Sequence, residues 1–194
     1  MPKIVDWEEQ RRQIGAALLE LASERGLDEV SVRTVAAASG RSPGAVQKYF
    51  RTKEEMLAFA AELAGERIER RMAEVDTALP PRRALRELLL TTLPLDAERR
   101  AEAAAQLAFA VHAAHHPRLA AIRRRVDRDI RQALTAWLES TGHGENAAAL
   151  ADAVVALADG LALRMLYAPH EHASLLAALD RALDALLPRD RSAD

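Results

Sequence analysis

The stretch SGRSPGAVQKYFRTKEEM, residues 39–56, is crowded with residues that end one helix and begin the next. Ser42 followed by Pro43 pairs a helix N-cap with a proline in the first helical position, where its missing N–H costs nothing. Gly40 stands just before this pair and suits the tight turn that ends a preceding helix. The stretch therefore predicts a short helix, lasting to about Phe50, that starts directly after a turn.

Helices are predicted on both sides of this short one. Apolar residues recur at helical spacing over residues 6–25, and Ser31 is placed to cap a second short helix over residues 32–38. Thr52 opens a T-x-x-E capping box for a long helix that we expect to last to about Ala78. Short helices separated by short turns are typical of a helix-turn-helix DNA-binding unit.

The rest of the chain is also predicted to be helical. Aromatic residues make up only 4% of the sequence, and Ala, Leu, Arg and Glu dominate, so strand propensity is poor. Prolines and glycines divide the second half into five amphipathic helices, at about residues 82–93, 97–114, 117–141, 146–167 and 173–187. We therefore expect an all-α protein with a three-helix N-terminal domain at residues 1–52, a larger helical domain at residues 53–188, and a tail at residues 189–194.

Positive charge is concentrated around the quoted stretch. The whole chain has a formal net charge of −2, yet Ser31 to Lys53 holds five basic residues and no acidic one. A basic segment on an acidic body indicates an anionic partner. The chain has no cysteine, which excludes disulfides and thiolate metal sites, and no signal segment or apolar run long enough to cross a membrane. We therefore expect a soluble, cytoplasmic protein with no membrane partner.

In a helix-turn-helix unit the second helix enters the major groove of DNA with its N-terminal residues at the base edges. Small residues at the start of the predicted helix allow close approach, and side chains with donors follow them. The predicted DNA-binding surface consists of Arg33, Thr34, Arg41, Ser42, Pro43, Gly44, Ala45, Gln47, Lys48, Tyr49 and Lys53. Gln47 and Arg41 are the candidates for reading bases, and the alternative for the basic and polar residues is an ordinary solvated surface.

Residues 11–57 resemble the DNA-binding domain of the TetR family of transcriptional regulators. The match extends from the Ala/Leu face of the first helix to Leu57 and includes Gly26, Val30, Ser31, Val32, Val35, Ala36, Gly40, Ser42, Gly44, Phe50, Lys53 and Glu54. Arg41, Gln47 and Tyr49 depart from the residues common in the family, which affects the DNA sequence that is bound. The second half resembles the family only through AHHPRL and ALADGLALRML.

This resemblance implies an all-helical homodimer whose second domain binds a small molecule. We accordingly expect a ligand-responsive regulator, most simply a repressor that a small-molecule effector releases from double-stranded operator DNA. It implies no cofactor and no enzymatic activity.

The effector site is predicted among large side chains and histidines of the second half. The candidates are Phe109, His112, His116, Trp137, Met165 and Tyr167. An alanine-rich helical layer leaves space that such side chains either fill as ordinary core or frame as a pocket, and both interpretations stay open. The pattern H-x-x-H-H formed with His115 could be half a metal site, but no cysteine or carboxylate pattern completes it, so we predict none.

The last two helices carry leucine-rich stripes that predict a homodimer interface. The stripes contain Leu150, Val154, Leu157, Leu161, Leu176, Leu179 and Leu183. Two such helices from each of two chains would form a four-helix interface. The alternative is that both stripes cover the core of the protomer itself.

Two other functions compete with transcriptional regulation. One is a small-molecule-binding helical protein with a vestigial DNA-binding domain, against which the basic segment argues. The other is a helical enzyme that uses His112 or His116 with Asp127 or Asp159 as acid and base. The absence of a converged catalytic motif argues against it.

Overall fold

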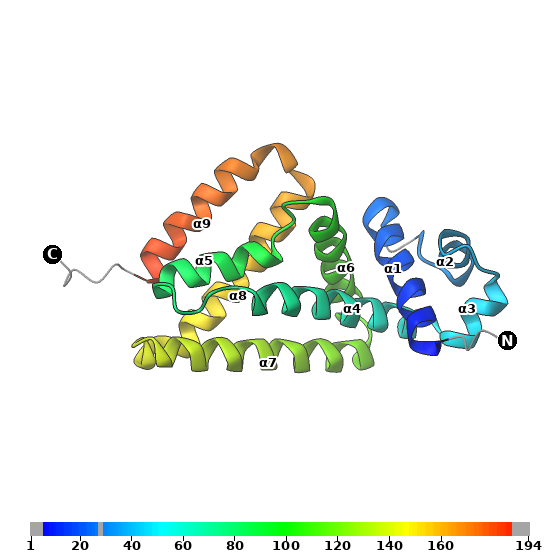
Figure 1. The fold of residues 1–194 in the computed structure, drawn as a ribbon, viewed down its shortest axis with the longest axis horizontal. Helices are drawn as coiled ribbons and strands as arrows, with labels where there is room; N and C mark the ends of the chain where they lie inside the picture. The colour runs from blue at the N-terminus through cyan, green and yellow to red at the C-terminus, as the bar shows by residue number, and fades with distance from the viewer. Residues whose placement is uncertain (1–5, 27–28, 188–194) are drawn as a thin grey trace. The chain divides into compact units, whose positions relative to one another are not determined.

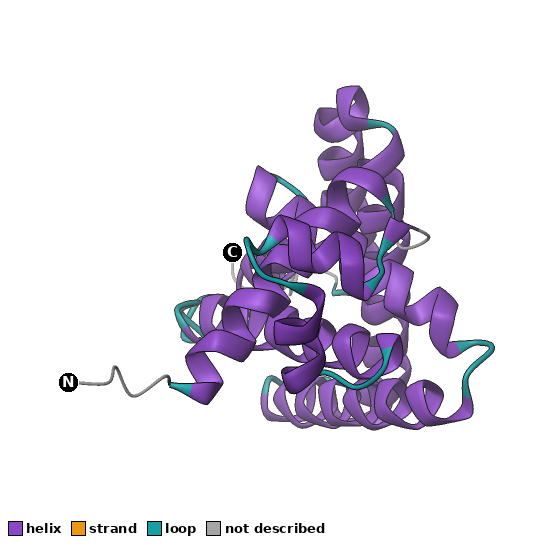
Figure 2. Ribbon diagram, turned by 90° about the vertical axis from the view of Figure 1, so that its right-hand side faces the viewer, coloured by secondary structure: helices purple, strands orange, loops and turns teal. Residues whose placement is uncertain are grey.

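The computed structural model describes residues 6–26 and 29–187, and every regular element in these ranges is helical (Figures 1 and 2). The chain forms α1 (Trp7–Arg25), α2 (Val32–Ala38), α3 (Pro43–Tyr49), α4 (Lys53–Ala73), α5 (Pro81–Thr92), α6 (Ala97–Ala113), α7 (Pro117–Ser140), α8 (Ala147–Tyr167) and α9 (His172–Leu186), with short 3-10 turns η2 (Gly144–Asn146) and η3 (Pro169–Glu171). The predicted all-α class is confirmed. The predicted tail, residues 189–194, lies outside the described residues.

The helix starts follow from local capping. Asp6 accepts hydrogen bonds from the backbone N–H groups of Glu8 and Glu9, which begins α1. At the start of α4, the Thr52 hydroxyl accepts from the Glu55 N–H at 3.1 Å, as the capping box predicts. The Glu55 carboxylate, however, accepts from the Arg51 N–H at 2.7 Å, one residue before the cap. Each cap satisfies backbone donors that the first helical turn leaves unpaired.

The end of α4 differs from the prediction. The helix ends at Ala73 instead of continuing to about residue 78. The next two backbone N–H groups, of Glu74 and Val75, bond to carbonyls three residues back, and the Asp76 carboxylate then accepts from the Ala78 N–H. The side chain of Asp76 thus offers the backbone an alternative to the helix, which aspartate commonly does at turns.

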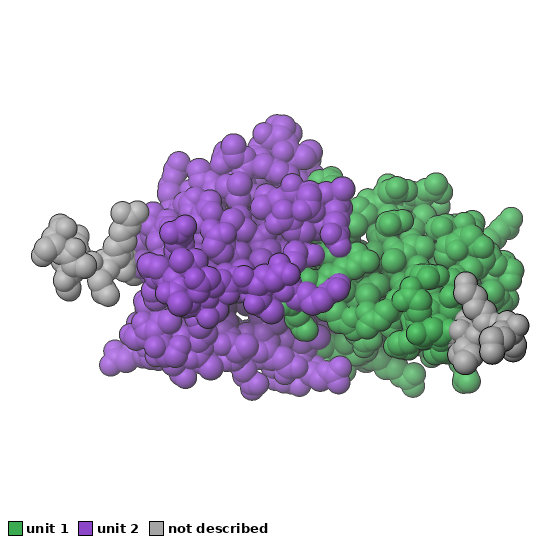
Figure 3. Space-filling view, in the orientation of Figure 1, with its two compact units in different colours: residues 1–69, 100–122 green, residues 70–99, 123–194 purple. Residues whose placement is uncertain are grey.

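The chain divides into two compact units, coloured separately in Figure 3. The first unit comprises residues 1–69 and 100–122, so it contains α1, α2 and α3 together with most of α4 and α6. Its core includes Ile14, Val35, Val46, Phe50 and Phe59, with Ala105, Phe109 and Ala113 from α6. The predicted boundary at residue 52 falls inside this unit, because α1, α2 and α3 share their core with α4 and α6.

The second unit comprises residues 70–99 and 123–194. Its core is formed mainly by leucines of α5, α8 and α9, with Leu138 from α7. Arg86 of α5 donates to Asp180 of α9 at 2.7 Å, and Arg82 pairs with Asp184 at 2.5 Å. The hydrogen bond from Arg86 holds the pKa of the Asp180 carboxyl below its ordinary value. These ion pairs lie beside the apolar contact of α5 with α9 in the second unit.

Gly15 allows α1 and α4 to pack closely in the first unit. A Cβ atom built on Gly15 would lie 2.9 Å from Cε1 of Phe59, and the Phe59 side chain is itself buried. Separations this short force the surrounding side chains to move. The absence of a side chain at Gly15 is therefore a packing requirement of this helix pair.

We predict that Gly15→Ala destabilises the protein, because crowding Phe59 costs about 1–3 kcal/mol and outweighs the gain of about 1 kcal/mol in helix propensity. The matched control is Gly65→Ala in α4, where a new Cβ meets no atom within 4 Å, and there we expect a small stabilisation. Chemical denaturation of both variants gives the two free energies of unfolding. Equal stabilisation at both positions would contradict the packing argument.

Candidate nucleic-acid interface

The turn between α2 and α3 has a fixed geometry. Gly40 has a φ of 66°, in the left-handed region that glycine adopts without steric cost. The Arg41 N–H bonds to the Ala36 carbonyl at 2.8 Å and the Gly40 N–H bonds to the Ala37 carbonyl at 3.2 Å. This pair of hydrogen bonds is a Schellman motif, which ends α2. Ser42 then caps α3 two residues after Gly40, so α3 begins at a defined angle.

One face of α3 is exposed and the other is buried. Val46 and the following Phe50 point into the core of the first unit. The exposed residues are Ser42, Pro43, Gly44, Gln47 and Lys48, while Ala45 is half-buried. A Cβ at Gly44 would meet no atom within 4 Å, so packing within the protomer does not require glycine there. The start of α3 is thus a surface without bulky side chains, followed by an amide and an ammonium group.

Residues Ser31 to Lys53 form a basic surface segment. Arg33 on α2 is exposed, like Lys48, and Lys53 at the start of α4 is half-buried. The carboxylates that follow are held at the helix start, where Glu55 accepts from the Arg51 N–H. Hydrogen bonds from its own backbone N–H and from Thr52 lower the pKa of Glu54. The arrangement presents basic side chains next to the exposed face of α3.

Several of the predicted DNA-binding residues use their polar groups within the protomer. The Ser42 hydroxyl accepts from the Ala45 N–H at 3.2 Å when it caps α3. The Thr34 hydroxyl donates to the Glu29 carbonyl at 2.7 Å and completes the capping box with Ser31. Nη2 of Arg41 donates to Oε1 of Gln13 in α1 at 2.8 Å, and Nε of Arg41 is buried without a partner. Of the two candidates for reading bases, Arg41 is thus engaged by α1, whereas Gln47 is exposed.

Three residues of α1 contact the α3 region and were missed by the sequence reasoning. Gln13 accepts from Arg41, the Trp7 ring packs at a tilt against Tyr49 with ring centroids 4.2 Å apart, and the Arg11 guanidinium lies 5.1 Å from the Phe50 ring centroid. The one available signal was an aromatic residue, Trp7, at the polar start of an amphipathic helix. Helical periodicity does not indicate which distant residues such a side chain meets.

The predicted effector residues are shared equally between the two units. Phe109 is buried in the core of the first unit, where the rings of His112 and His116 stack with centroids 5.4 Å apart. In the second unit Met165 is buried and Trp137 packs against the core, whereas Tyr167 is 67% exposed. The six residues stay predictions for the effector site.

The side chains that a helical enzyme would use as acid and base lie in different units. Asp127 and Asp159 both pair with Arg123, at 2.8 and 3.9 Å, in the second unit, whereas His112 and His116 belong to the first. Over residues 6–26 and 29–187, no group of three or more His, Asp or Glu side chains could hold a metal ion.

The predicted interface leucines lie mostly inside the protomer. Val154, Leu161, Leu179 and Leu183 are buried in the core of the second unit. Leu150, Leu157 and Leu176 are half-buried against the same core. The exposed large hydrophobic residues of α8 are instead Leu163 and Tyr167. Any interface on α8 would therefore have to use the outward face of the helix.

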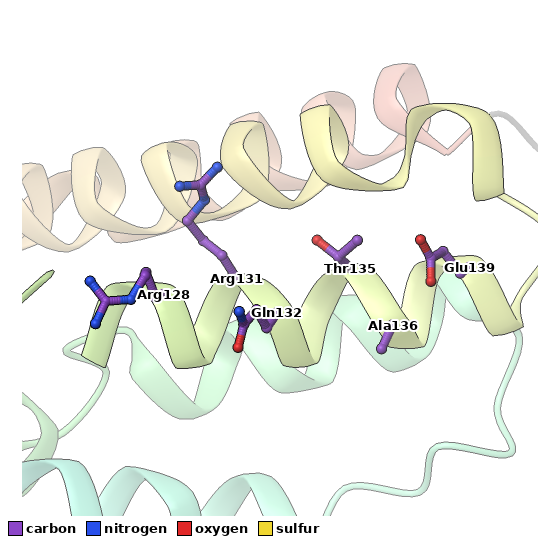
Figure 4. A pocket seen from close by; sticks show the side chains of 6 residues that line it. All are labelled: Arg128, Arg131, Gln132, Thr135, Ala136 and Glu139. Atoms are coloured by element: carbon purple, nitrogen blue, oxygen red, sulfur yellow. The ribbon is translucent and has the colours of Figure 1, made fainter. Parts of the chain in front are cut away.

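A hollow lies along α7, with a volume of about 330 Å³ (Figure 4). It is lined by Arg128, Arg131, Gln132, Thr135, Ala136 and Glu139, all from this one helix. Arg131 reaches across to α8, where it pairs with Asp152 at 2.8 Å. A hollow lined by a single helix encloses little of a ligand, and it contains none of the predicted effector residues. No helix within the described ranges is long and apolar enough to cross a membrane.

Two family models match the chain. The model for bacterial regulatory proteins of the tetR family matches residues 14–59, which include α2 and α3. The model for the C-terminal part of BetI-type transcriptional repressors matches residues 81–188. Together they account for both the helix-turn-helix region and the helices from α5 onward.

Individual relatives agree with these matches. The chain is 35% identical over 116 residues to the HTH-type transcriptional regulator PksA of Bacillus subtilis, a match that spans 59% of this chain and 57% of PksA. A transcriptional regulator from Rhodococcus sp. Rha1 superimposes with a TM-score of 0.85 at 41% identity, covering 91% of this chain and 95% of that one. GusR of Salmonella enterica, at 20% identity and a TM-score of 0.75, covers 95% of this chain and 98% of its own and shares the fold. The chain belongs to the TetR family of transcriptional regulators.

Proposed function

We propose that this protein is a repressor that binds operator DNA through α3 and releases it when a small molecule binds the protein. The observation that carries the proposal is the two-sided character of α3. Val46 and Phe50 anchor the helix in the core, while Ser42, Gly44 and Gln47 are exposed on a basic surface. A helix anchored in this way can enter the major groove as a rigid element.

The exposed side chains suggest distinct roles on DNA. The Gln47 amide has both a donor and an acceptor, which matches the N6 and N7 edge of adenine. Lys48 and Arg33 are exposed cations and would contact phosphates, which carry no sequence information. Sequence preference is therefore assigned to Gln47, and general affinity to the cations.

We predict that Gln47→Ala changes preference at one base pair by about 1–3 kcal/mol, whereas Lys48→Ala weakens all sequences similarly and reduces the salt dependence. The operator is first selected from random DNA with the purified protein. Fluorescence anisotropy on that operator and its single-base variants then gives the affinities at several salt concentrations. Gln132→Ala, on the exposed face of α7, is the control. Unchanged binding by both α3 variants would contradict the proposal.

The effector is proposed from family membership and from relatives of the same fold. A Saccharomonospora viridis protein with a TM-score of 0.76 was solved in complex with choline, and the multidrug binding protein EbrR was solved with imidazole. In this chain α4 contributes to both units, since residues 53–69 belong to the first and residues 70–73 to the second. A ligand that moves α4 could thereby alter the α3 surface.

We predict reciprocal coupling between effector and operator. A ligand identified by thermal-shift screening should weaken operator binding by about 1–3 kcal/mol, and operator should weaken ligand binding by the same factor. Two isothermal titrations of the ligand, with and without saturating operator, measure the effect. Replacing Trp137 with Ala should reduce ligand affinity and leave operator affinity without ligand nearly unchanged. Identical ligand affinities in the two titrations would exclude this ligand as the inducer.

The homodimer is proposed to form through the outward face of α8. Ala149, Ala156, Gly160, Leu163 and Tyr167 lie on one side of this helix, and all are exposed. Small residues permit close helix approach, and the two large side chains supply apolar area. This face replaces the buried leucines, which already pack within the protomer.

We predict that Leu163→Glu produces a folded monomer, because it places a charge in the proposed apolar contact. Light scattering measures the mass and far-UV circular dichroism checks the fold. Val111→Glu, at another exposed apolar side chain, is the control and should stay dimeric. A Leu163→Glu variant that is still dimeric would place the interface elsewhere.

A further inference from the structure

Trp7 is an exposed tryptophan beside the proposed recognition helix. It is the first residue of α1 and is 52% exposed. Its ring lies 4.2 Å from the Tyr49 ring between centroids, with the planes inclined by 37°. Tyr49 is the last residue of α3 and is half-buried. An aromatic pair therefore links the start of α1 to the end of α3.

The backbone under Trp7 is held in place. The Asp6 carboxylate accepts from the N–H groups of Glu8 and Glu9 at 3.1 and 3.3 Å, which fixes the first turn of α1 around Trp7. An aromatic ring on a fixed helical turn has few conformations, so it restricts the ring stacked against it. Tyr49 is half-buried against the core of the first unit, and the Trp7 ring limits the rotamers that this packing leaves open. The stack thus selects one orientation of the Tyr49 phenol before any partner binds.

Contacts with α1 are made on both sides of α3. Before α3, Gln13 accepts from Arg41 at 2.8 Å and donates to Glu9 at 2.9 Å. Immediately after α3, the Arg11 guanidinium lies over the Phe50 ring. These contacts with side chains of α1 therefore hold the recognition helix in position at both of its ends.

We propose that Trp7 is a positioning residue for DNA recognition, which holds the Tyr49 phenol so that its hydroxyl donates to a backbone phosphate. This inference rests on the proposed binding of DNA through α3. Ordering the phenol in the free protein removes a loss of rotamer freedom that would otherwise oppose binding. Trp7 acts through Tyr49 and makes no contribution to base preference.

If Trp7 only stabilised the fold, its removal would lower the free energy of unfolding; the positioning role predicts a different result. The ring is half in solvent and stacks on a partner that is itself half-buried, so its removal exposes little additional core. Loss of Trp7 should consequently leave the unfolding transition nearly unchanged while weakening DNA binding. The two roles are separated by measuring stability and operator affinity on the same variants.

The test is a double-mutant cycle on the full-length protein with its selected operator. Trp7→Ala should weaken operator binding by about threefold to tenfold, and Trp7→Phe, which keeps a stacking ring, should restore most of the affinity. Tyr49→Phe, which keeps the ring and removes the hydroxyl, should weaken binding by a similar factor. The double variant Trp7→Ala with Tyr49→Phe should bind about as well as either single variant, because both remove the same contact. Val111→Ala, another exposed apolar side chain, is the control for affinity and stability.

The outcomes separate this inference from the proposed function. Losses from Trp7→Ala and Tyr49→Phe that multiply in the double variant would show that Trp7 does not act through Tyr49. Unchanged affinity in Trp7→Ala, with reduced affinity in Lys48→Ala, would overturn the inference and leave DNA binding by α3 intact. If the Gln47 and Lys48 variants also bind normally, both proposals fail together. A fall in affinity that Trp7→Phe does not restore would overturn the stacking argument.

Discussion

The contact between Phe59 and Gly15 is the constraint on which the first unit depends. Phe59 projects from α4 onto the bare backbone of α1, and its ring lies 5.4 Å from that of Phe50 at the end of α3. The Arg11 guanidinium lies over both rings, 4.4 Å from the Phe59 centroid and 5.1 Å from that of Phe50. One buried side chain thereby joins three helices. Since α3 has only seven residues, its position is determined by these contacts and not by its own stability.

The same arrangement explains how a short helix can serve as a binding element. The Schellman turn at Gly40 and the cap at Ser42 define where α3 begins, and Val46 and Phe50 fix its inner face. The outer face of α3 then contributes little to the fold, apart from the contact of Tyr49 with Trp7 of α1. A surface whose backbone is rigid, and whose side chains are mostly free, can differ among family members without loss of the fold.

The second unit is built on different interactions. Its core is almost entirely aliphatic, and the contact of α5 with α9 is supplemented by the ion pairs of Arg82 and Arg86 with Asp180 and Asp184. The BetI-type model covers this part of the chain from residue 81 onward. The few large side chains of this unit, such as Trp137 and Met165, belong to that core or pack against it.

Local sequence alone determined where most helices begin and end. The signals at Ser31, Ser42, Thr52 and Pro117 involve groups within a few residues of each other, so α2, α3 and the start of α4 and α7 could be predicted without knowledge of the fold. Helical periodicity likewise identified the apolar stripes of α8 and α9. It could not indicate whether a second chain or the protomer covers them, and the tertiary structure places Val154, Leu161, Leu179 and Leu183 in the protomer core.

Arg41 and Tyr49 show the same division. Their positions in the helix-turn-helix unit follow from sequence, but their partners Gln13 and Trp7 come from α1, far away along the chain. Caps and periodicity are short-range properties of the chain, whereas side-chain partners depend on which helices are brought together, and only tertiary packing decides that.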